Sequence, residues 1–322
     1  MMNNGWIYSD RITKQTAGKT VLQYYVERYR HSSESEWESR IRSGAVRLGD
    51  RGCDDRGCDA GEILKVNQIL AYHRPPWEES EVPRSIEILH EDADLLVINK
   101  PSGLPVMPGG GFLENTLLRL LAALYPENSP IPIHRLGRGT SGLMLLARST
   151  AAKAELTRQM RDRDIQKVYL ALASGVMASG VMASGVMASS VVQCDRFSID
   201  TRIGKVPHPV LGELFAASET GLEARSEVRV LEQRSDSTLV EVEIFTGRPH
   251  QIRIHLASVG HPLVGDPLYG PGGKAIVAQD WDEIAVPGDC GYCLHAQRLG
   301  FRHPRSGDRL EFVTQVPEWA KH

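Results

Sequence analysis

The 322-residue sequence lacks the two kinds of segment that direct a chain to or through a membrane. It has no apolar run approaching the roughly 20 residues that a helix needs to cross a bilayer. Its first residues, MMNNGWIYSDRITKQ, lack the basic start and apolar stretch of a secretory signal. We therefore expect a cytoplasmic protein without a membrane partner. Its composition, 41% hydrophobic and 24% charged residues, is typical of globular proteins.

The chain also has few cysteines, five in all. Cys290 and Cys293 form one C-x-x-C pair, and a structural zinc would need a second pair, such as Cys53 and Cys58, to meet it. That second pair belongs to RGCDDRGCDA, a tandem five-residue repeat, so duplication alone explains its spacing. We expect free thiols and no metal, with a zinc site as the alternative.

The formal net charge of −3 is not spread evenly along the chain. Eight basic and three acidic residues lie between positions 134 and 167, and eight minus three leaves a local charge of +5. The basic residues are Arg135, Arg138, Arg148, Lys153, Arg158, Arg161, Arg163 and Lys167. Because phosphate groups respond to the local field, this segment favours a nucleic acid as partner. The alternative is a solvated helix face rich in arginine.

Residues 1–80 are expected to form a small N-terminal module. The segment TVLQYYVERYR has apolar side chains at helical spacing, and SEWESRIRSGAVRLGD predicts a short helix, a turn and a strand. EILKVNQILAYHRPP adds a strand that ends at the double proline. This order resembles a small RNA-binding module of certain ribosomal proteins. A plain N-terminal scaffold is the alternative.

Residues 81–322 are expected to form the main domain, a mixture of strands and helices. Strands are predicted in SIEILHEDADLLVINK, KVYLALASG and TLVEVEIF. Helices are predicted in TAAKAELTRQMRDRD and in NTLLRLLAALY, where Asn115 is the expected N-cap.

The repeat GVMASGVMASGVMASS, at about residues 175–190, is too short in period for a solenoid and is expected to be a surface loop. Deleting one five-residue unit should change the free energy of unfolding by less than about 1 kcal/mol, because loop closure depends weakly on length. Urea denaturation of the deletion variant tests this. A variant that failed to fold would show that the segment is structural.

The segment HRLGRGTSGLMLLA contains the pattern G-x-G-x-x-G in Gly137, Gly139 and Gly142. The dinucleotide-binding version of this pattern follows a strand and opens a helix. Here a proline-rich stretch precedes it, and the apolar run GLMLLA after it predicts a buried strand. No helix N-terminus is in place for a pyrophosphate, so we do not expect a nucleotide loop.

The segment TGRPHQIRIHLASVG predicts a sharp turn followed by a helix with Ile252, Leu256 and Val259 on one buried face. His250 and Arg253, three residues apart, share another face that points back toward Arg248. A cluster of two guanidiniums and an imidazole suits an anionic ligand or a buried carboxylate. The alternative is that one of the arginines ties down loop carbonyls.

Five motifs together resemble the RluA-type RNA pseudouridine synthases: NKPSGLPVMP, HRLGRGTSGLMLLA, KVYLALASG, TGRPHQIRIHLASVGHPLVGDPLYG and LHAQRLGFRHPRSG. They occur in the family's order over about residues 85–320. The resemblance implies an α+β pseudouridine synthase fold, with a large, mainly antiparallel mixed sheet, flanking helices and a central cleft. It also implies conversion of uridine to pseudouridine in ribosomal or transfer RNA, by a monomer that needs no cofactor or metal.

The resemblance also assigns site residues. The family's catalytic aspartate falls on Gly137, Tyr169 matches the tyrosine that packs under the base, and Arg253 matches the arginine that pairs with the aspartate. Arg135 matches the arginine that enters the RNA helix. The other expected RNA contacts are Arg138, Arg161, Arg163 and Lys167, and the other expected pocket residues are His134, Leu136, Arg248, His250, Asp266 and Leu294. Lys100 also falls on a family position, without an assigned role.

Glycine can neither attack nor accept a proton, so the sequence leaves three hypotheses open. In the first, the protein is an unusual RNA pseudouridine synthase in which another carboxylate substitutes, with Asp266 as the first candidate. In the second, it is a catalytically silent RNA-binding protein of the same fold. In the third, the basic cleft serves a protein partner. Retention of Tyr169 and Arg253 favours the first, because an RNA clamp needs neither.

Overall fold

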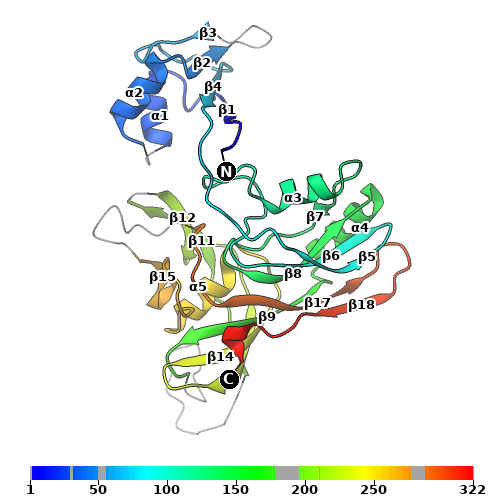
Figure 1. The fold of residues 1–322 in the computed structure, drawn as a ribbon. Helices are drawn as coiled ribbons and strands as arrows, with labels where there is room; N and C mark the ends of the chain where they lie inside the picture. The colour runs from blue at the N-terminus through cyan, green and yellow to red at the C-terminus, as the bar shows by residue number, and fades with distance from the viewer. Residues whose placement is uncertain are drawn as a thin grey trace. The chain divides into compact units, whose positions relative to one another are not determined.

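The computed structural model describes residues 2–29, 32–49, 56–177, 196–209, 211–276 and 287–321 (Figure 1). Most of the GVMAS repeat and Cys53 lie outside these ranges. The chain divides into two compact units. The smaller consists of Met1–Ser80 with Pro207–Glu213, and the larger of Glu81–Val206 with Leu214–His322.

The smaller unit packs two helices against a four-stranded sheet. The helices are α1 (Val21–Arg28) and α2 (Glu34–Arg42). The sheet has the order β1 (Trp6–Arg11), β4 (Ile69–Arg74), β2 (Val46–Gly49) and β3 (Arg56–Gly57). A capping box starts each helix, at Thr20 and at Ser33, which explains where the two helices begin. The core centres on Trp37, whose ring stacks on Tyr25 at 4.5 Å.

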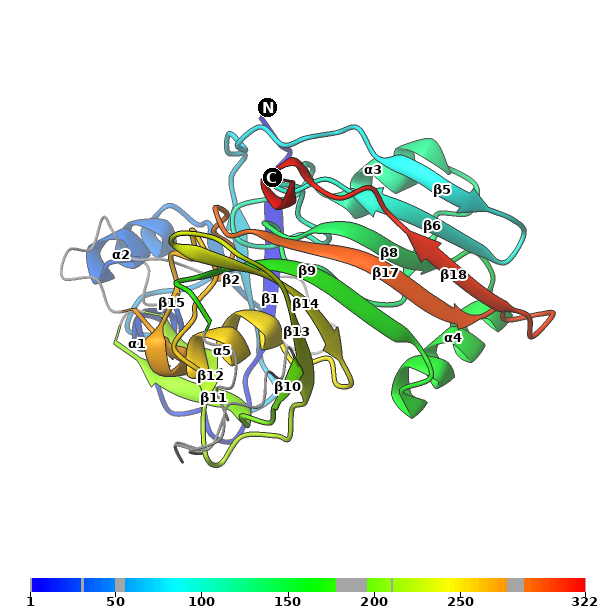
Figure 2. The same ribbon diagram turned by 90° about the horizontal axis from the view of Figure 1, so that it is seen from below.

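The larger unit is built on a ten-stranded mixed sheet. Its main path runs β10 (Arg196–Ile199), β13 (Ser226–Gln233), β14 (Ser237–Ile244), β9 (Gln166–Ser174), β17 (Leu294–Arg302), β8 (Ser141–Ala147), β6 (Leu95–Lys100) and β5 (Glu87–Glu91). Figure 2 shows these strands side by side in this order. Off this path, β18 (Arg309–Val313) pairs with β17, and β7 (Ile131–Pro132) pairs with β8.

All strand pairs of this sheet are antiparallel except β17 with β8, in the middle of the sheet. The predicted strand after the G-x-G-x-x-G segment is β8, which is buried from Gly142 to Ala147. The described residues therefore confirm the predicted α+β fold with a mainly antiparallel mixed sheet. They also agree with the rejection of a nucleotide loop, because a strand follows the glycines.

Three helices accompany the sheet: α3 (Leu117–Leu124), α4 (Thr150–Asp162) and α5 (Gln251–Ser258). The predicted N-cap of α3 is wrong by one residue. Thr116 is the cap, and its hydroxyl accepts from the Arg119 amide, whereas the Asn115 side chain accepts from Arg84. The prediction for α5 is also too simple, because all residues from 251 to 257 are buried and Val259 lies beyond the helix.

The smaller described elements complete this part of the chain. They are β11 (Ile203–His208), β12 (Gly212–Ala217), β15 (Tyr269–Gly270), β16 (Lys274–Ala275) and the 3₁₀ turns η1 (Pro271–Gly273) and η3 (Glu318–Ala320). None of the helices described here is both long and apolar enough to cross a membrane.

Candidate active site

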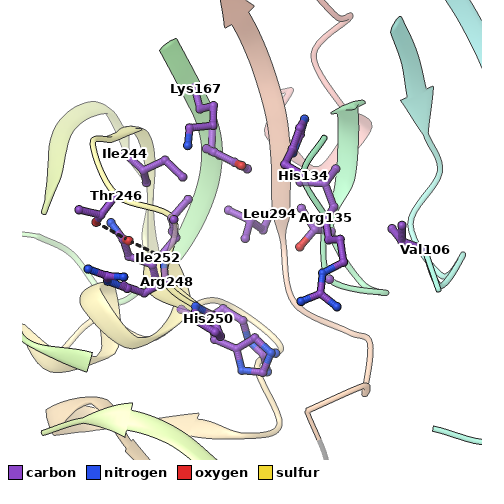
Figure 3. Close-up of a pocket in the computed structure, with 18 of the residues that line it drawn as sticks. Val106, His134, Arg135, Lys167, Ile244, Thr246, Arg248, His250, Ile252 and Leu294 are labelled. Carbon is purple, nitrogen blue, oxygen red and sulfur yellow. Dashed lines mark hydrogen bonds between the residues drawn. The ribbon is translucent and has the colours of Figure 1, made fainter. Parts of the chain in front are cut away.

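A cleft of about 830 Å³ opens over the middle of the larger unit's sheet. Its walls come from the loop after β6, the loop before β8, the end of α4, the start of β9, the end of β14, the first turn of α5 and the start of β17. Figure 3 shows Lys167, Ile244 and Arg248 on one side, His134 and Arg135 on the other, and Leu294 between them. The loop before β8 and the start of β17, two strands that pair in parallel, both contribute residues to the lining.

The structure brings nearly all the predicted site residues to this one cleft. Those that line it are Gly137, Tyr169, Arg253, Arg135, Arg138, Arg161, Arg163, Lys167, His134, Leu136, Arg248, His250 and Leu294. They come from four segments that are far apart in the sequence. Asp266 is the exception, since it is not among the residues that line the cleft.

The cleft lining is entirely basic among its charged residues. Six arginines and one lysine line it, whereas no Asp or Glu is among the described lining residues. Other arginines of the basic segment are already neutralised: Arg158 pairs with Glu155 and Asp162 on α4, and Arg148 pairs with Glu91. Part of the local positive charge predicted from the sequence, including that of Arg135, Arg161 and Arg163, therefore lies in the cleft.

Two of the predicted RNA-contacting arginines differ in how many contacts their side chains already make with the protein. Arg138 is held by the protein, because its Nε donates to the Gly103 carbonyl at 3.2 Å and its guanidinium lies 4.5 Å from the Phe112 ring centre. Arg161 has a side chain that is 73% exposed and contacts only its neighbour Asp162. Arg161 is therefore the better candidate for an RNA contact than Arg138.

The Gly137 corner is closed by a tyrosine. A β-carbon at this position would lie 2.7 Å from Tyr292 Oη and 3.4 Å from Thr140 Oγ1. These two hydroxyls are 3.2 Å apart and share a hydrogen bond. Gly137 does not have a positive φ, so its backbone does not require glycine. The backbone of the loop therefore allows a side chain at position 137, but the Tyr292 hydroxyl occupies the space that this side chain would need.

Arg253 forms a buried ion pair with Asp266. Its Nε and Nη2 each donate to one carboxylate oxygen at 2.7 Å, and the two side chains are 2% and 0% exposed. Although burial opposes the charge, the hydrogen bonds to Asp266 leave the pKa of Arg253 above its ordinary value. Asp266 also accepts from the amides of Leu268 and Tyr269.

These contacts correct the expectation for Asp266. A carboxylate does reach the Arg253 guanidinium, but it is fully buried, is not exposed in the cleft and already accepts four hydrogen bonds. It can therefore hold Arg253 in place, but it cannot reach a substrate in the cleft from this position.

Burial opposes ionisation of the histidines, the lysine and the tyrosine Tyr169 that line the cleft. Burial lowers the pKa of His134 to about 3, and its Nε2 accepts from the Leu145 amide at 3.1 Å, which requires an unprotonated nitrogen. Burial likewise lowers the pKa of His250 to about 4 and lowers the pKa of Lys167. It raises the pKa of Tyr169. At neutral pH neither histidine therefore adds positive charge to the cleft.

Lys100, to which the sequence assigned no role, supports the loop that contains Gly137. Its side chain is buried, and Nζ donates to the carbonyls of Pro101, Leu104 and Arg138 at 2.8, 2.9 and 3.3 Å. One ammonium group therefore joins the loop after β6 to the loop before β8.

Thr140 and Tyr292 are among the cleft residues that the sequence did not predict. Tyr292 lies in GYCLHA, two positions before the predicted pocket residue Leu294. Its place close to Leu294 made Tyr292 a candidate pocket residue, but nothing in the sequence indicated that it meets Gly137. Thr140 belongs to the same HRLGRGTSG segment as Gly137, and its amide donates to the Gly137 carbonyl at 3.1 Å.

Among the described residues, only Asp92, Asp94 and His303 are grouped closely enough to hold a metal ion together. None of them lines the cleft, and Asp94 already pairs with Arg305 at 2.6 Å. The described cysteines, Cys58, Cys290 and Cys293, are free thiols.

The chain is similar to known RNA-modifying proteins. The family model described as RNA pseudouridylate synthase matches residues 94–258. An uncharacterized RNA pseudouridine synthase of Synechocystis sp. is 43% identical over 300 residues, which cover 92% of this chain and 94% of that protein. Ribosomal large subunit pseudouridine synthase D of Neisseria meningitidis serogroup B is 33% identical, over 90% of this chain and 74% of that protein.

A solved structure supports the fold. Human RNA Pseudouridylate Synthase Domain Containing 1 superimposes with a TM-score of 0.52 at 24% identity, over 75% of this chain and 87% of that one. With the family match and the relatives above, the chain belongs to the RluA-type RNA pseudouridine synthases, a family of RNA-modifying isomerases.

Proposed function

We propose that the cleft binds structured RNA and isomerises a uridine that is flipped into it. The observation that carries this proposal is the lining: seven cationic side chains and no described Asp or Glu, in a chain whose formal net charge is −3. Such a lining attracts a polyphosphate backbone, because each phosphate that a cationic side chain neutralises releases counterions from the nucleic acid. Ribosomal RNA is the substrate class that we favour, because the Neisseria relative is named for the large ribosomal subunit.

The cleft floor offers the flipped base an apolar surface. Leu294, Ile252 and Tyr169 are buried side chains that line the cleft close to its basic rim. An extruded base must exchange stacking in the RNA for contacts of this kind. Arg135 is exposed, and its one side-chain hydrogen bond to the described residues goes to Met107 Sδ at 3.7 Å, so it can enter the space that the nucleotide leaves.

The chemical step needs a group other than the side chain at position 137. The lining of the described cleft contains no carboxylate, and Asp266 is engaged with Arg253. We therefore propose that Gly137 makes this chain a slow synthase, with RNA binding retained. The silent RNA-binding hypothesis differs from this proposal only in predicting no turnover at all.

RNA binding should depend on the exposed arginines at the end of α4. Changing Arg161 to Ala and Arg163 to Asn should weaken binding and reduce the slope of log affinity against log salt by about one per lost phosphate contact. Asn is chosen at position 163 because Arg163 has φ of 66°, a conformation that Asn tolerates. Fluorescence anisotropy with a labelled ribosomal RNA fragment over a salt series measures both effects.

Arg158→Ala is the matched control for this experiment. Arg158 lies on the same helix, but it pairs with Glu155 and Asp162 and does not line the cleft. We expect its salt slope to equal that of the unchanged chain. Equal slopes for the control and the double variant would place the RNA elsewhere.

The remaining features of this proposal concern the whole chain. We propose that the protein acts as a monomer in the cytoplasm, without a membrane partner, and that residues 1–80 form a module that adds RNA contacts. Exposed aromatic and basic side chains in that module support the last point, since Trp6 and Tyr8 on β1 are 46% and 39% exposed and Arg11 and Arg47 are exposed as well.

A further inference from the structure

His250 differs from the cationic side chains of the cleft because it can accept a hydrogen bond. The six arginines of the lining can only donate. His250 lines the same cleft as the N-cap residue of α5, and Figure 3 places it across from Arg135. The role of an imidazole depends on which of its two nitrogens carries the hydrogen, and the contacts of His250 decide this.

Two linked hydrogen bonds fix the hydrogen of His250 on Nδ1. Tyr269 Oη lies 2.6 Å from the Phe215 carbonyl oxygen and 2.7 Å from His250 Nδ1. Because a carbonyl oxygen can only accept, the single hydroxyl hydrogen of Tyr269 is donated to Phe215. Nδ1 must then carry a hydrogen and donate it to Tyr269 Oη. Burial and the charge of Arg253 lower the pKa of His250 to about 4, so at neutral pH the ring is neutral and Nε2 carries no hydrogen.

The second ring nitrogen of His250 is open to the cleft. The described residues make no hydrogen bond to Nε2, and Nε2 is not a buried atom. The side chain is part-exposed, and the volume in front of it is that of the cleft. His250 therefore offers a bound molecule an acceptor that no group of the protein uses.

The position of His250 suits a ribose. In the chain it stands between Arg248, which is charged and part-exposed, and Ile252, which is buried in the apolar part of the lining. In a nucleotide the ribose likewise lies between the phosphate and the base. Of the sugar and phosphate groups of an RNA strand, the 2′-hydroxyl is the one that can donate a hydrogen bond, and DNA lacks it.

We propose that His250 Nε2 accepts a hydrogen bond from the ribose 2′-hydroxyl of the nucleotide in the cleft and thereby makes the site selective for RNA over DNA. Tyr269 is the positioning residue, since its hydroxyl holds the ring in the accepting tautomer. This inference rests on the proposed RNA binding. It does not depend on turnover, so it applies equally to a catalytically silent RNA-binding protein.

Fluorescence anisotropy of the full chain with three labelled RNA stem–loops tests this contact. The first is unmodified and has all its uridines in the loop. The second has 2′-fluorouridine at these positions, which keeps the RNA sugar pucker but removes the 2′ donor. The third has N3-methyluridine, which removes the donor of the base instead. The 2′-fluoro RNA should bind about fivefold more weakly than the unmodified RNA, the scale of one neutral hydrogen bond.

His250→Asn removes the acceptor with little other change. Asn tolerates the φ of 55° at this position, and its amide can still donate to Tyr269. The variant should bind unmodified RNA about fivefold more weakly, and its penalty for 2′-fluorine should fall by the same factor. His261→Asn is the matched control, because Nδ1 of His261 also has a hydrogen bond, with the Ser174 carbonyl oxygen at 2.9 Å, but His261 does not line the cleft. It should keep the full fluorine penalty.

The outcomes are distinct. An equal 2′-fluorine penalty in His250→Asn and the unchanged chain would overturn the inference. A penalty that His250→Asn loses only for N3-methyluridine would also overturn it, because Nε2 would then contact the base. Failure of the unchanged chain to bind any of the three RNAs would overturn the proposed function and this inference with it. If His250→Asn does not fold, ¹⁵N NMR of the histidine rings in the unchanged chain still decides, since a hydrogen on Nε2 of His250 would exclude the acceptor.

Discussion

Gly137→Asp is expected to raise tritium release from 5-tritiated uridine RNA by at least about 100-fold, the scale of a missing catalytic group. The variant places a carboxylate at the position of the family's catalytic aspartate. Arg253, whose Nη1 has no described partner, is available to bind it. The unchanged chain and the variant are measured side by side, with equal RNA occupancy verified by anisotropy.

The structure identifies what could oppose this gain. The loop itself does not, because Gly137 has no positive φ and accepts any L residue. Tyr292 does, since its hydroxyl lies 2.7 Å from the new β-carbon and must move. We therefore expect Gly137→Asp/Tyr292→Phe to be at least as active as the single variant, because it removes the atom in closest contact. Tyr292→Phe alone is the control and should not gain activity.

The outcomes of this experiment separate the hypotheses. Turnover by the unchanged chain excludes the silent RNA-binding protein. Turnover only by the aspartate variants supports the hypothesis of a silent RNA-binding protein and shows that the rest of the site is intact. If no variant releases tritium from any RNA that it binds tightly, the cleft is an RNA clamp and the synthase proposal loses its support.

Local patterns predicted much of this molecule because they depend on neighbours in sequence. The run GLMLLA predicted β8, since an uninterrupted apolar run suits a strand covered on both faces, and all six residues are buried. The basic segment predicted an anionic partner because arginines close in sequence remain close in space. The five motifs brought Gly137, Tyr169 and Arg253 to one cleft, as the resemblance implied.

The parts that sequence could not supply depend on contacts between distant segments. Tyr292 reaches Gly137 across 155 positions, through the parallel pairing of β17 with β8. Asp266 was expected in the pocket, but the turn at residues 265–269 directs its carboxylate to Arg253 and to two backbone amides. Helix α5 was expected to bury one face, yet tertiary packing buries every residue from 251 to 257. Neither periodicity nor spacing carries such information.

The Asp266→Asn variant is expected to lose about 3–5 kcal/mol of unfolding free energy, the usual cost of breaking a buried ion pair from one side. The change is nearly isosteric, so no cavity contributes. It leaves Arg253, 2% exposed, facing an amide nitrogen in place of a carboxylate oxygen. Urea denaturation, followed by far-UV circular dichroism, should show a lower midpoint with an unchanged slope.

Asp162→Asn is the matched control, because it removes the same charge from an arginine pair whose side chains are 45% and 39% exposed. Its midpoint should stay within error of the unchanged chain, since solvent screens such pairs. A loss below about 1 kcal/mol for Asp266→Asn would mean that Arg253 turns to another acceptor. A large loss of unfolding free energy would show that Asp266 holds Arg253 in place, which is the geometry that the gain of activity in Gly137→Asp requires.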